Sequence, residues 1–353
     1  MVHGPIGVRY IQSRAPLSQL LSIADFEAAA ETRMPAGVWA RIQGGAADET
    51  TLRWNCEAWR QMRLRPRVLV DVSELDTCVT LFGQQLPFPI LLAPTGAQAL
   101  IHPNGDLETA VGAAAVDATL VISSSASLRI EQIACHTAAP VWFQLYVQRD
   151  RAFTKDLVQC AESSGCRVLC VTVDSPTHGT RDREHRFQGD LPTRELPNFA
   201  GKDYLDPTLT WKDIDWLLSF AKTPVVLKGI LDADDAETSI KAGVAGMVVS
   251  NHGGRNLDTA PSTADALSEV AKRVQGRVPL IVDGGIRRGT DIVKALALGA
   301  SAVQIGRPYL YGLAVAGAEG VAQVVRILRK ELELAMMLCG RPTLASLNPT
   351  VFW

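Results

Sequence analysis

The 353-residue sequence has no large excess of charge and no long apolar run. Its 35 lysines and arginines nearly balance its 37 aspartates and glutamates, so the formal net charge is −2 and the isoelectric point lies near 6.3. A basic surface that would attract nucleic acid or an anionic membrane is therefore not expected. No stretch of about 18 consecutive apolar residues is found, so no membrane-spanning helix is expected either.

Cysteine is scarce, and its spacing indicates neither a disulfide framework nor a metal site. The seven cysteines form no C-x-x-C pair, their number is odd, and their surroundings are apolar, as in Cys166–Cys170. These features favour reduced thiols in a cytosolic protein without a bound metal. Residues 1–6 lack the apolar core of a signal peptide, and residues 350–353 are not a peroxisomal Ser-Lys-Leu tag. We therefore expect a soluble cytoplasmic protein.

The sequence also lacks a G-x-G-x-x-G motif after its first predicted strand, which argues against a dinucleotide-binding fold. Instead, short apolar runs rich in β-branched residues alternate with helical stretches. Eight such runs occur, at Phe88–Ala93, Thr119–Ser123, Val141–Tyr146, Val168–Val173, Val225–Lys228, Gly246–Ser250, Pro279–Asp283 and Ser301–Ile305. Runs that are apolar on both faces are typical of parallel strands covered by helices. Eight βα units in one chain predict an α/β fold with a closed (β/α)₈ TIM barrel.

The chain is expected to form a single domain over residues 1–353. We assign residues 1–85 to an N-terminal helical segment and cover, and residues 86–353 to the barrel with its C-terminal helix at Val321–Leu338. The stretch Gln188–Leu209, between the fourth and fifth strands, contains three prolines and breaks the alternation. It is predicted to be a long loop over the top of the barrel that acts as a lid.

Polar residues gather at the C-terminal ends of the predicted strands, which is where barrels of this kind carry their active sites. They are Gln144 and Tyr146 on strand 3, Thr172 and Asp174 on strand 4, Lys228 on strand 5, Ser250, His252 and Arg255 after strand 6, Asp283, Gly285 and Arg287 after strand 7, and Gly306 and Arg307 after strand 8. The last two groups combine glycine turns with an arginine. Backbone N–H groups and a guanidinium fork together form a phosphate cradle, so a phosphate-bearing ligand is predicted there.

The run Ser250–Asp258 resembles the active-site signature of the FMN-dependent 2-hydroxy-acid oxidase and dehydrogenase family, which includes glycolate oxidase, lactate oxidase and mandelate dehydrogenase. Asn256 stands where the family usually has Gln. Further matches follow in family order at Leu64–Arg67, Ala93–Thr95, Phe143–Tyr146, Thr172–Asp174, Leu227–Gly229, Asp283–Gly285 and Gly306–Pro308. The resemblance implies FMN as cofactor and oxidation of an (S)-2-hydroxy acid to the 2-oxo acid.

The resemblance also implies roles for four catalytic residues. His252 would act as the base, and Asp174 would hold and stabilise the imidazolium. Tyr146 would hydrogen-bond the substrate hydroxyl, and Lys228 would lie near flavin N1, where negative charge collects on reduction.

The remaining positions that match the family would bind the substrate and the cofactor. Arg255 and Arg181 would grip the substrate carboxylate through paired hydrogen bonds. The FMN contacts implied are Pro94, Thr95, Gly96, Ser123, Gln144, Thr172, Lys228, Ser250, Asp283, Gly285, Arg287, Gly306 and Arg307.

Three positions of the expected substrate pocket depart from the family. Arg41 replaces a Tyr that helps to bind the carboxylate, Ser125 stands where glycolate oxidase has Trp, and His178 occupies a position that often faces the substrate. Drift, or an alignment slip of one residue, is one interpretation. The other is a substrate whose side chain is larger, more polar or anionic than that of glycolate or lactate, with Arg41 or His178 pairing its second charge.

The electron acceptor is predicted from the loop Gln188–Leu209. Membrane-bound dehydrogenases of the family carry a hydrophobic insertion there, whereas this loop is shorter than theirs, mixed in composition and charged. A soluble enzyme reoxidised by O₂ to give H₂O₂ is expected. A soluble dehydrogenase with another acceptor, and a monooxygenase that decarboxylates the oxo acid, remain as alternatives. An FMN barrel isomerase or an inactive binding protein is disfavoured by the intact His252, Arg255, Lys228 and Tyr146. Relatives form tetramers or octamers, so a homo-oligomer is expected.

Overall fold

The computed structural model describes residues 16–137, 139–187, 189, 191, 195–199 and 205–353. Eight parallel strands close into a barrel in the order β10-β3-β4-β5-β6-β7-β8-β9. The strands are β3 (Ile90–Leu92), β4 (Thr119–Ser123), β5 (Val141–Leu145), β6 (Leu169–Thr172), β7 (Val225–Ile230), β8 (Gly246–Val249), β9 (Leu280–Val282) and β10 (Ala302–Ile305). Each coincides with one of the eight predicted runs, so the prediction of a (β/α)₈ barrel is confirmed.

The barrel interior is apolar in its middle and polar at its C-terminal end. Side chains of a strand alternate between its two faces, so residues two apart share the interior. One layer is a buried apolar cluster with a residue from every strand: Leu91, Val121, Trp142, Cys170, Val226, Val248, Ile281 and Ala302. Two residues further along the strands, the same side carries Ala93, Ser123, Gln144, Thr172, Lys228, Ser250, Asp283 and Gln304. Strand periodicity alone therefore places a ring of mostly polar side chains on top of an apolar floor.

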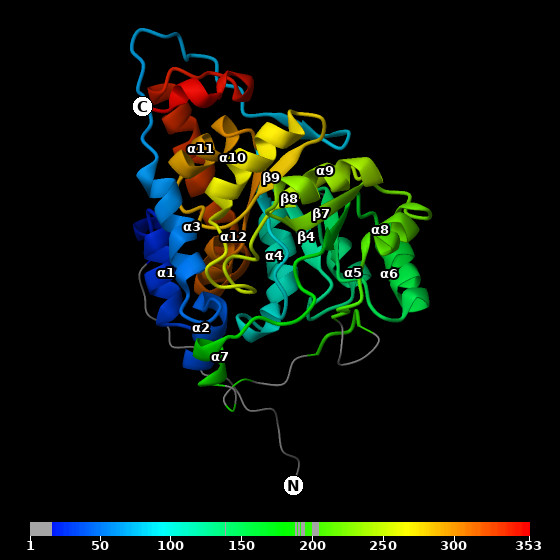
Figure 1. Cartoon of the computed structure of the whole chain (residues 1–353). Helices are drawn as coiled ribbons and strands as arrows, with labels where there is room; N and C mark the ends of the chain where they lie inside the picture. Colours follow the sequence, from blue (N-terminus) through cyan, green and yellow to red (C-terminus); the bar gives the residue numbers. More distant parts are fainter. Residues whose placement is uncertain (1–15, 138, 188, 190, 192–194, 200–204) are drawn as a thin grey trace.

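A two-stranded hairpin closes the opposite end of the barrel. It is formed by β1 (Val79–Leu81) and β2 (Gln84–Leu86), which pair antiparallel, and the sequence did not lead us to expect it. The turn residues Phe82 and Gly83 both have positive φ, as a tight hairpin turn requires. Leu81 and Leu86 join the interior apolar cluster, and the ring of Phe82 packs edge-on against Trp142. The light-blue segment that contains the hairpin crosses the end of the barrel away from α2 and α7 (Figure 1).

A helix follows each strand and covers the outside of the barrel. These helices are α4 (Gly105–Ala114), α5 (Ile130–Ala134), α6 (Arg151–Ser163), α8 (Trp211–Leu218), α9 (Ala233–Ala242), α10 (Thr263–Val274), α11 (Gly289–Ala297) and α12 (Arg307–Leu338). The short helix α7 (Asp182–His185) lies in the connection between β6 and α8. Ten of the 22 residues of the lid predicted at Gln188–Leu209 fall outside the described residues.

Three N-terminal helices support the C-terminal end of the barrel. They are α1 (Ile23–Glu31), α2 (Ala36–Gln43) and α3 (Thr50–Gln61). Trp59 of α3 donates from Nε1 to the carbonyl of Gly284 at 2.8 Å. The amides of Asn55 and Asn251 exchange two hydrogen bonds of 2.9 and 2.8 Å. These contacts fix the loops that follow β8 and β9, while α2 lies against α7 at the same end of the molecule (Figure 1).

Helix α12 is long and apolar, although no uninterrupted apolar run of that length was found in the sequence. Among the described residues it is the one helix that could cross a membrane by length and composition, with a mean hydropathy of 1.2. However, 61% of its apolar window is buried inside the protein, against α1, α4 and α11. Its helical backbone is also broken at Ala316 and Gly317, where Gly317 has a φ of 56°. Its burial is that of a core helix.

Asp106 provides a test of this packing. It lies in the first turn of α4, is 4% exposed, and accepts a hydrogen bond from the Ser127 N–H at 2.9 Å. Burial raises its pKa from 3.8 to about 6, despite that hydrogen bond. A raised carboxyl pKa stabilises the fold below the unfolded-state value, and this contribution is lost as pH rises through 6. Asp106→Asn should therefore increase the free energy of unfolding at pH 7.5 by on the order of 2 kcal/mol.

The measurement is denaturant unfolding of Asp106→Asn at pH 7.5 and at pH 4. The gain should shrink toward pH 4, because the asparagine oxygen can still accept from Ser127 and the native carboxyl is then protonated. Asp156→Asn, on the exposed face of α6, should change stability at neither pH. The same gain at both pH values would contradict the buried-charge explanation.

Candidate active site

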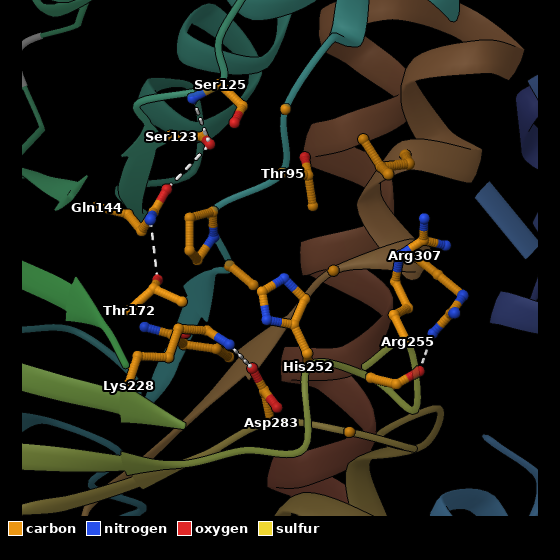
Figure 2. Close-up of a pocket in the computed structure, with 18 of the residues that line it drawn as sticks. Thr95, Ser123, Ser125, Gln144, Thr172, Lys228, His252, Arg255, Asp283 and Arg307 are labelled. Atoms are coloured by element: carbon orange, nitrogen blue, oxygen red, sulfur yellow. Dashed lines mark hydrogen bonds and ion pairs between the residues drawn. The ribbon is translucent and has the colours of Figure 1, made fainter. Parts of the chain in front are cut away.

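One pocket at the C-terminal end of the barrel gathers nearly all the residues predicted from sequence (Figure 2). Those that line it are Arg41, Pro94, Thr95, Gly96, Ser123, Gln144, Tyr146, Thr172, His178, Arg181, Lys228, His252, Arg255, Asp283, Gly285, Arg287, Gly306 and Arg307. The other two, Asp174 and Ser250, do not line the pocket but contact His252 and Lys228. Their roles in a reaction stay predictions.

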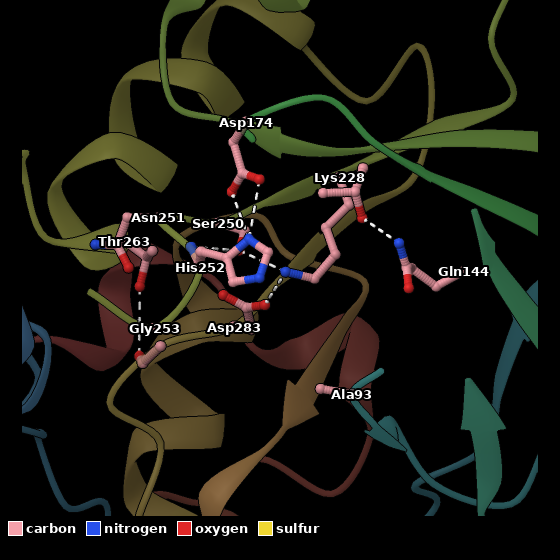
Figure 3. A network of polar contacts seen from close by, with 12 residues as sticks. Ala93, Gln144, Asp174, Lys228, Ser250, Asn251, His252, Gly253, Thr263 and Asp283 are labelled. Carbon is pink, nitrogen blue, oxygen red and sulfur yellow. Dashed lines mark hydrogen bonds and ion pairs between the residues drawn. The ribbon is translucent and has the colours of Figure 1, made fainter. Parts of the chain in front are cut away.

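His252 and Asp174 form the central pair of the pocket (Figure 3). The imidazole Nδ1 lies 2.9 Å from Asp174 Oδ1 and 3.2 Å from Oδ2. Asn256 holds the same loop by donating from Nδ2 to the Asp174 carbonyl at 2.8 Å. Burial would raise the pKa of Asp174, but the charge and hydrogen bond of His252, with the charge of Lys228, lower it overall. An ionised carboxylate on Nδ1 leaves Nε2 as the ring nitrogen that can exchange a proton.

The backbone around His252 explains the two glycines that follow it. His252, Gly253 and Gly254 have consecutive φ values of 57°, 64° and 73°, in the left-handed region. Gly254 also packs so closely that a Cβ there would lie 2.7 Å from the backbone nitrogen of Leu52. Glycine tolerates this region, whereas for histidine it is strained. A hydrogen bond of 3.1 Å from the His252 N–H to Ser250 Oγ helps to hold the histidine in it.

A buried ion pair lies on the floor of the pocket. Lys228 Nζ is 2.7 Å from Asp283 Oδ2 and donates to Ser250 Oγ at 2.7 Å. Burial alone would lower the pKa of Lys228, but the charges of Asp283 and Asp174 outweigh it and raise the pKa above its usual value. Lys228 therefore stays cationic, and a fixed positive charge faces whatever binds above it.

A hydrogen-bonded series of side chains forms one wall. Ser123 Oγ donates to Gln144 Oε1 at 3.1 Å, and Gln144 Nε2 donates to Thr172 Oγ1 at 2.9 Å. The three residues come from the neighbouring strands β4, β5 and β6, so the barrel sets their spacing. Their polar atoms suit the edge of a flat, heteroatom-rich ring.

Three arginines surround one carboxylate at the mouth of the pocket. Arg41 forms an ion pair with Glu184, Arg181 NH1 lies 3.7 Å from Glu184 Oε2, and Arg255 NH2 lies 3.4 Å from the same oxygen. Burial lowers the pKa of Arg255 well below its usual value, and the charges of Arg181, Arg307 and Arg41 lower it further. Positive charge is thus in excess here, and Glu184 marks a place where a carboxylate is held.

The loops after β9 and β10 form the predicted phosphate region. Gly284 and Gly285 both have positive φ, and the N-terminus of α12 begins after Gly306. A helix N-terminus presents unpaired N–H groups to an anion. Arg307 lines the pocket, but its guanidinium donates to three carbonyls, those of Ile42 at 2.8 Å, Gly44 at 2.8 Å and Gly253 at 3.0 Å. It therefore also ties the end of α2 to the loop that carries His252.

Sequence reasoning missed several residues of the site. Ser175 and Asn256 line the pocket beside the His252–Asp174 pair, and Glu184 joins the arginines. Gln304 of β10 also lines the pocket, and both polar atoms of its amide lack a partner among the described residues. A glutamine inside an apolar strand, two positions before Gly306, was an available signal. Nothing in the sequence linked Glu184 to Arg41, which lies 143 positions away.

Comparison with known proteins identifies the family. The profile of the FMN-dependent dehydrogenase family matches residues 30–353. The chain is 46% identical over 338 residues to a peroxisomal (S)-2-hydroxy-acid oxidase of Oryza sativa subsp. japonica, covering 91% of this chain and 92% of that protein. It is 41% identical over 348 residues to an L-lactate oxidase of Nostoc sp., covering 92% and 95%. A mandelate oxidase variant with (S)-mandelic acid superposes with a TM-score of 0.89 at 38% identity, covering 92% and 96%.

The chain belongs to the FMN-dependent dehydrogenase family, and the resemblance noted in its sequence is confirmed. It is an enzyme, and its cofactor is FMN. The pocket fits that group on independent grounds. Among the described residues, the amide of Gln304 and Asp283 Oδ1 are buried polar groups without a hydrogen-bond partner, and Lys228 adds a fixed cation. The wall formed by Ser123, Gln144 and Thr172 would meet the ring edge, and the glycine loops after β9 and β10 would meet the phosphate.

The arginine cluster leads to a prediction about Glu184. If its carboxylate occupies an anion-binding position, Glu184→Gln should tighten the binding of a small dicarboxylate such as oxalate by about tenfold, or 1.4 kcal/mol. The physical reason is that one competing negative charge is removed from three guanidinium groups. Titration at fixed ionic strength, followed by the flavin absorbance of the holoenzyme, measures the effect.

A matched control is Glu49→Gln. Glu49 forms an ion pair with Arg183, which precedes Glu184 in α7, but Glu49 does not line the pocket. Oxalate affinity should therefore not change in this variant. If Glu184→Gln weakens oxalate binding, the carboxylate positions the arginines and does not compete for them.

Proposed function

We propose that this protein oxidises an (S)-2-hydroxy acid to the 2-oxo acid and that O₂ is the final electron acceptor, which is reduced to H₂O₂. One observation carries the proposal. A histidine whose Nδ1 is held by a partly buried carboxylate lies in the same pocket as two arginines suited to a carboxylate. That pairing matches a substrate that must be both anchored by its carboxylate and deprotonated.

In the proposed reaction, Arg255 and Arg181 bind the substrate carboxylate and orient the hydroxyl carbon. Tyr146, which packs against Phe199 with ring centroids 6.5 Å apart, hydrogen-bonds the hydroxyl oxygen. His252 Nε2 accepts a proton from the substrate, and Asp174 stabilises the resulting imidazolium.

The substrate loses two electrons and two protons in this reaction and becomes the 2-oxo acid. Bound FMN supplies the two-electron acceptor. Lys228 keeps a positive charge on the pocket floor, where it favours the electron-rich form of a bound ring. Each protein group thus acts where charge appears: the carboxylate, the hydroxyl oxygen, the departing proton and the ring.

The choice of O₂ as acceptor is supported by the oxidase names of the rice and Nostoc relatives. A soluble dehydrogenase would reduce another acceptor, and a monooxygenase would retain the oxo acid and decarboxylate it. Anaerobic reduction of the holoenzyme by a panel of 2-hydroxy acids, followed by air and by product analysis, separates the three. Fast reoxidation with an intact oxo acid and peroxide supports the oxidase. Slow reoxidation in air would instead support the dehydrogenase, and a decarboxylated product would support the monooxygenase.

His252→Gln tests the assignment of the base. The rate of flavin reduction by the best substrate should fall by about 10²- to 10⁴-fold, because proton transfer loses its acceptor. Stopped-flow absorbance measures that rate, while oxalate affinity should remain close to that of the wild type because the arginines are untouched. A variant that reduces its flavin at the native rate would exclude His252 as the base.

We propose further that the substrate carries a polar or anionic side chain. Arg41 and His178 both line the pocket beside Arg181, and Ser125 leaves a small side chain where a relative has Trp. Arg41 already binds one carboxylate, that of Glu184. A second anionic group on the substrate could take the place of the Glu184 carboxylate at Arg41.

Arg41→Tyr tests this preference on a matched pair, (S)-2-hydroxybutanedioate and (S)-2-hydroxybutanoate. The native protein should favour the dicarboxylate in kcat/KM, and Arg41→Tyr should reduce that ratio by about tenfold, equivalent to 1.4 kcal/mol. Steady-state kinetics of both proteins on both acids is the measurement. Equal efficiency of the native protein on the two acids would rule out a role for Arg41 in selecting charge.

A homo-oligomer and a cytoplasmic location complete the proposal. Exposed apolar side chains gather where residues 68–70 meet the end of α12, with Val68, Leu69, Leu338 and Trp353 all solvent-exposed. The N–H of Arg67 bonds to the Leu338 carbonyl at 3.2 Å, which joins the two segments. Such a patch is suited to self-association. All seven cysteines are free thiols, as suits a reducing compartment.

A further inference from the structure

Gln304 is a buried polar side chain that the described part of the chain leaves unsatisfied. It is 1% exposed and lies on β10. Both Nε2 and Oε1 are buried without a hydrogen-bond partner among the described residues. A buried polar group without a partner costs about 1–3 kcal/mol. Because Gln304 lines the pocket, a group bound in the pocket can form the hydrogen bonds that its amide lacks.

A second unsatisfied atom lies on the next strand. The register pairs Val303 of β10 with Val282 of β9, so Gln304 follows alongside Asp283. Asp283 bonds to Lys228 through Oδ2, whereas its Oδ1 is buried and has no hydrogen-bond partner in the described ranges of the chain. Neighbouring strands therefore offer one donor, Gln304 Nε2, and two acceptors, Gln304 Oε1 and Asp283 Oδ1.

The ligand that satisfies these atoms must both donate and accept hydrogen bonds at adjacent positions. A carboxylate or phosphate oxygen only accepts, so it leaves the two acceptors Gln304 Oε1 and Asp283 Oδ1 unsatisfied. A hydroxyl does both. Two or more neighbouring hydroxyls would satisfy the donor and both acceptors together.

The position of Gln304 indicates which part of the cofactor carries those hydroxyls. The series Ser123–Gln144–Thr172 lies on β4, β5 and β6, where it suits the ring edge. The phosphate region lies in the loops after β9 and β10. Gln304 lies on β10 and Asp283 directly follows β9, so both lie below those loops. The part of FMN that joins its ring to its phosphate is a chain of hydroxyl-bearing carbons.

We propose that Gln304 is a cofactor-binding residue whose amide, together with Asp283, hydrogen-bonds the ribityl hydroxyls of FMN. The inference rests on FMN as the cofactor, but it does not depend on which substrate is oxidised or which acceptor follows. The apolar barrel strands otherwise give this position no reason to carry an amide, since β10 is buried along its whole length.

The experiment compares two flavins on apoprotein prepared from the holoenzyme. Riboflavin carries the ribityl chain, whereas lumiflavin has the same ring with a methyl group in its place. Gln304→Leu should weaken riboflavin binding by about tenfold, the loss of one or two hydrogen bonds. It should leave lumiflavin affinity unchanged. Quenching of flavin fluorescence on titration measures both dissociation constants.

Gln144→Leu is the matched control, since it makes the same substitution in the same interior layer but at the predicted ring edge. Gln144→Leu should weaken the binding of riboflavin and of lumiflavin to a similar extent. Equal losses for both flavins in Gln304→Leu would assign its amide to the ring and overturn the proposal. No loss for either flavin would mean that water or Asp283 satisfies the amide, which would overturn it as well.

Thermal unfolding gives a second readout that does not need lumiflavin to bind tightly. Gln304→Leu should raise the Tm of the apoprotein, because an unsatisfied buried amide is removed, and should reduce the increase in Tm that FMN produces. Equal lowering of Tm in the presence and absence of FMN would indicate a structural role and contradict the proposal. Flavin that binds normally but is reduced by no hydroxy acid would reject the proposed reaction and leave this inference standing.

Discussion

Closing eight parallel strands into a barrel forces every second side chain of each strand into a shared interior. Val226 and Lys228 are two positions apart on β7, and Asp283 follows Ile281 by two positions just beyond the end of β9. In each pair the first residue belongs to an apolar core and the second to a polar pocket. The apolar layer excludes water from beneath the polar one. Lys228 and Asp283 consequently face each other in a low-dielectric setting, where the charges of Asp283 and Asp174 keep the pKa of Lys228 above its usual value despite burial.

The N-terminal helices belong to the site as much as the barrel does. Asn55 and Trp59 of α3 hold the loops after β8 and β9, and Arg41 enters the pocket from the end of α2. Arg307 donates hydrogen bonds both to carbonyls at that end of α2 and to the Gly253 carbonyl, and so links α2 to the loop after β8. A strained histidine backbone persists because several elements determine its position at once.

The sequence predicted features that depend on neighbouring residues. Short apolar runs gave the eight strands, and the run from Ser250 to Asp258 gave the family, because both patterns are local. It did not predict contacts that depend on how distant segments meet. The hairpin of β1 and β2 is too short and too polar to read as strand, and its stability comes from packing under Trp142. Glu184 joins Arg41 only after α7 docks on α2, and the isolation of Gln304 is visible only when its surroundings are known.

The hairpin of β1 and β2 has a consequence for how small molecules reach the pocket. Leu81, Leu86 and Phe82 close the floor, so the barrel opens at the end where the arginines lie. In the proposed reaction, substrate, product and electron acceptor therefore reach the described pocket from that end of the barrel. If the proposed oxidase is correct, the residence time of the oxo acid in the pocket decides whether it is still bound when peroxide forms, so the same catalytic groups serve two outcomes that differ only in the order in which the products leave.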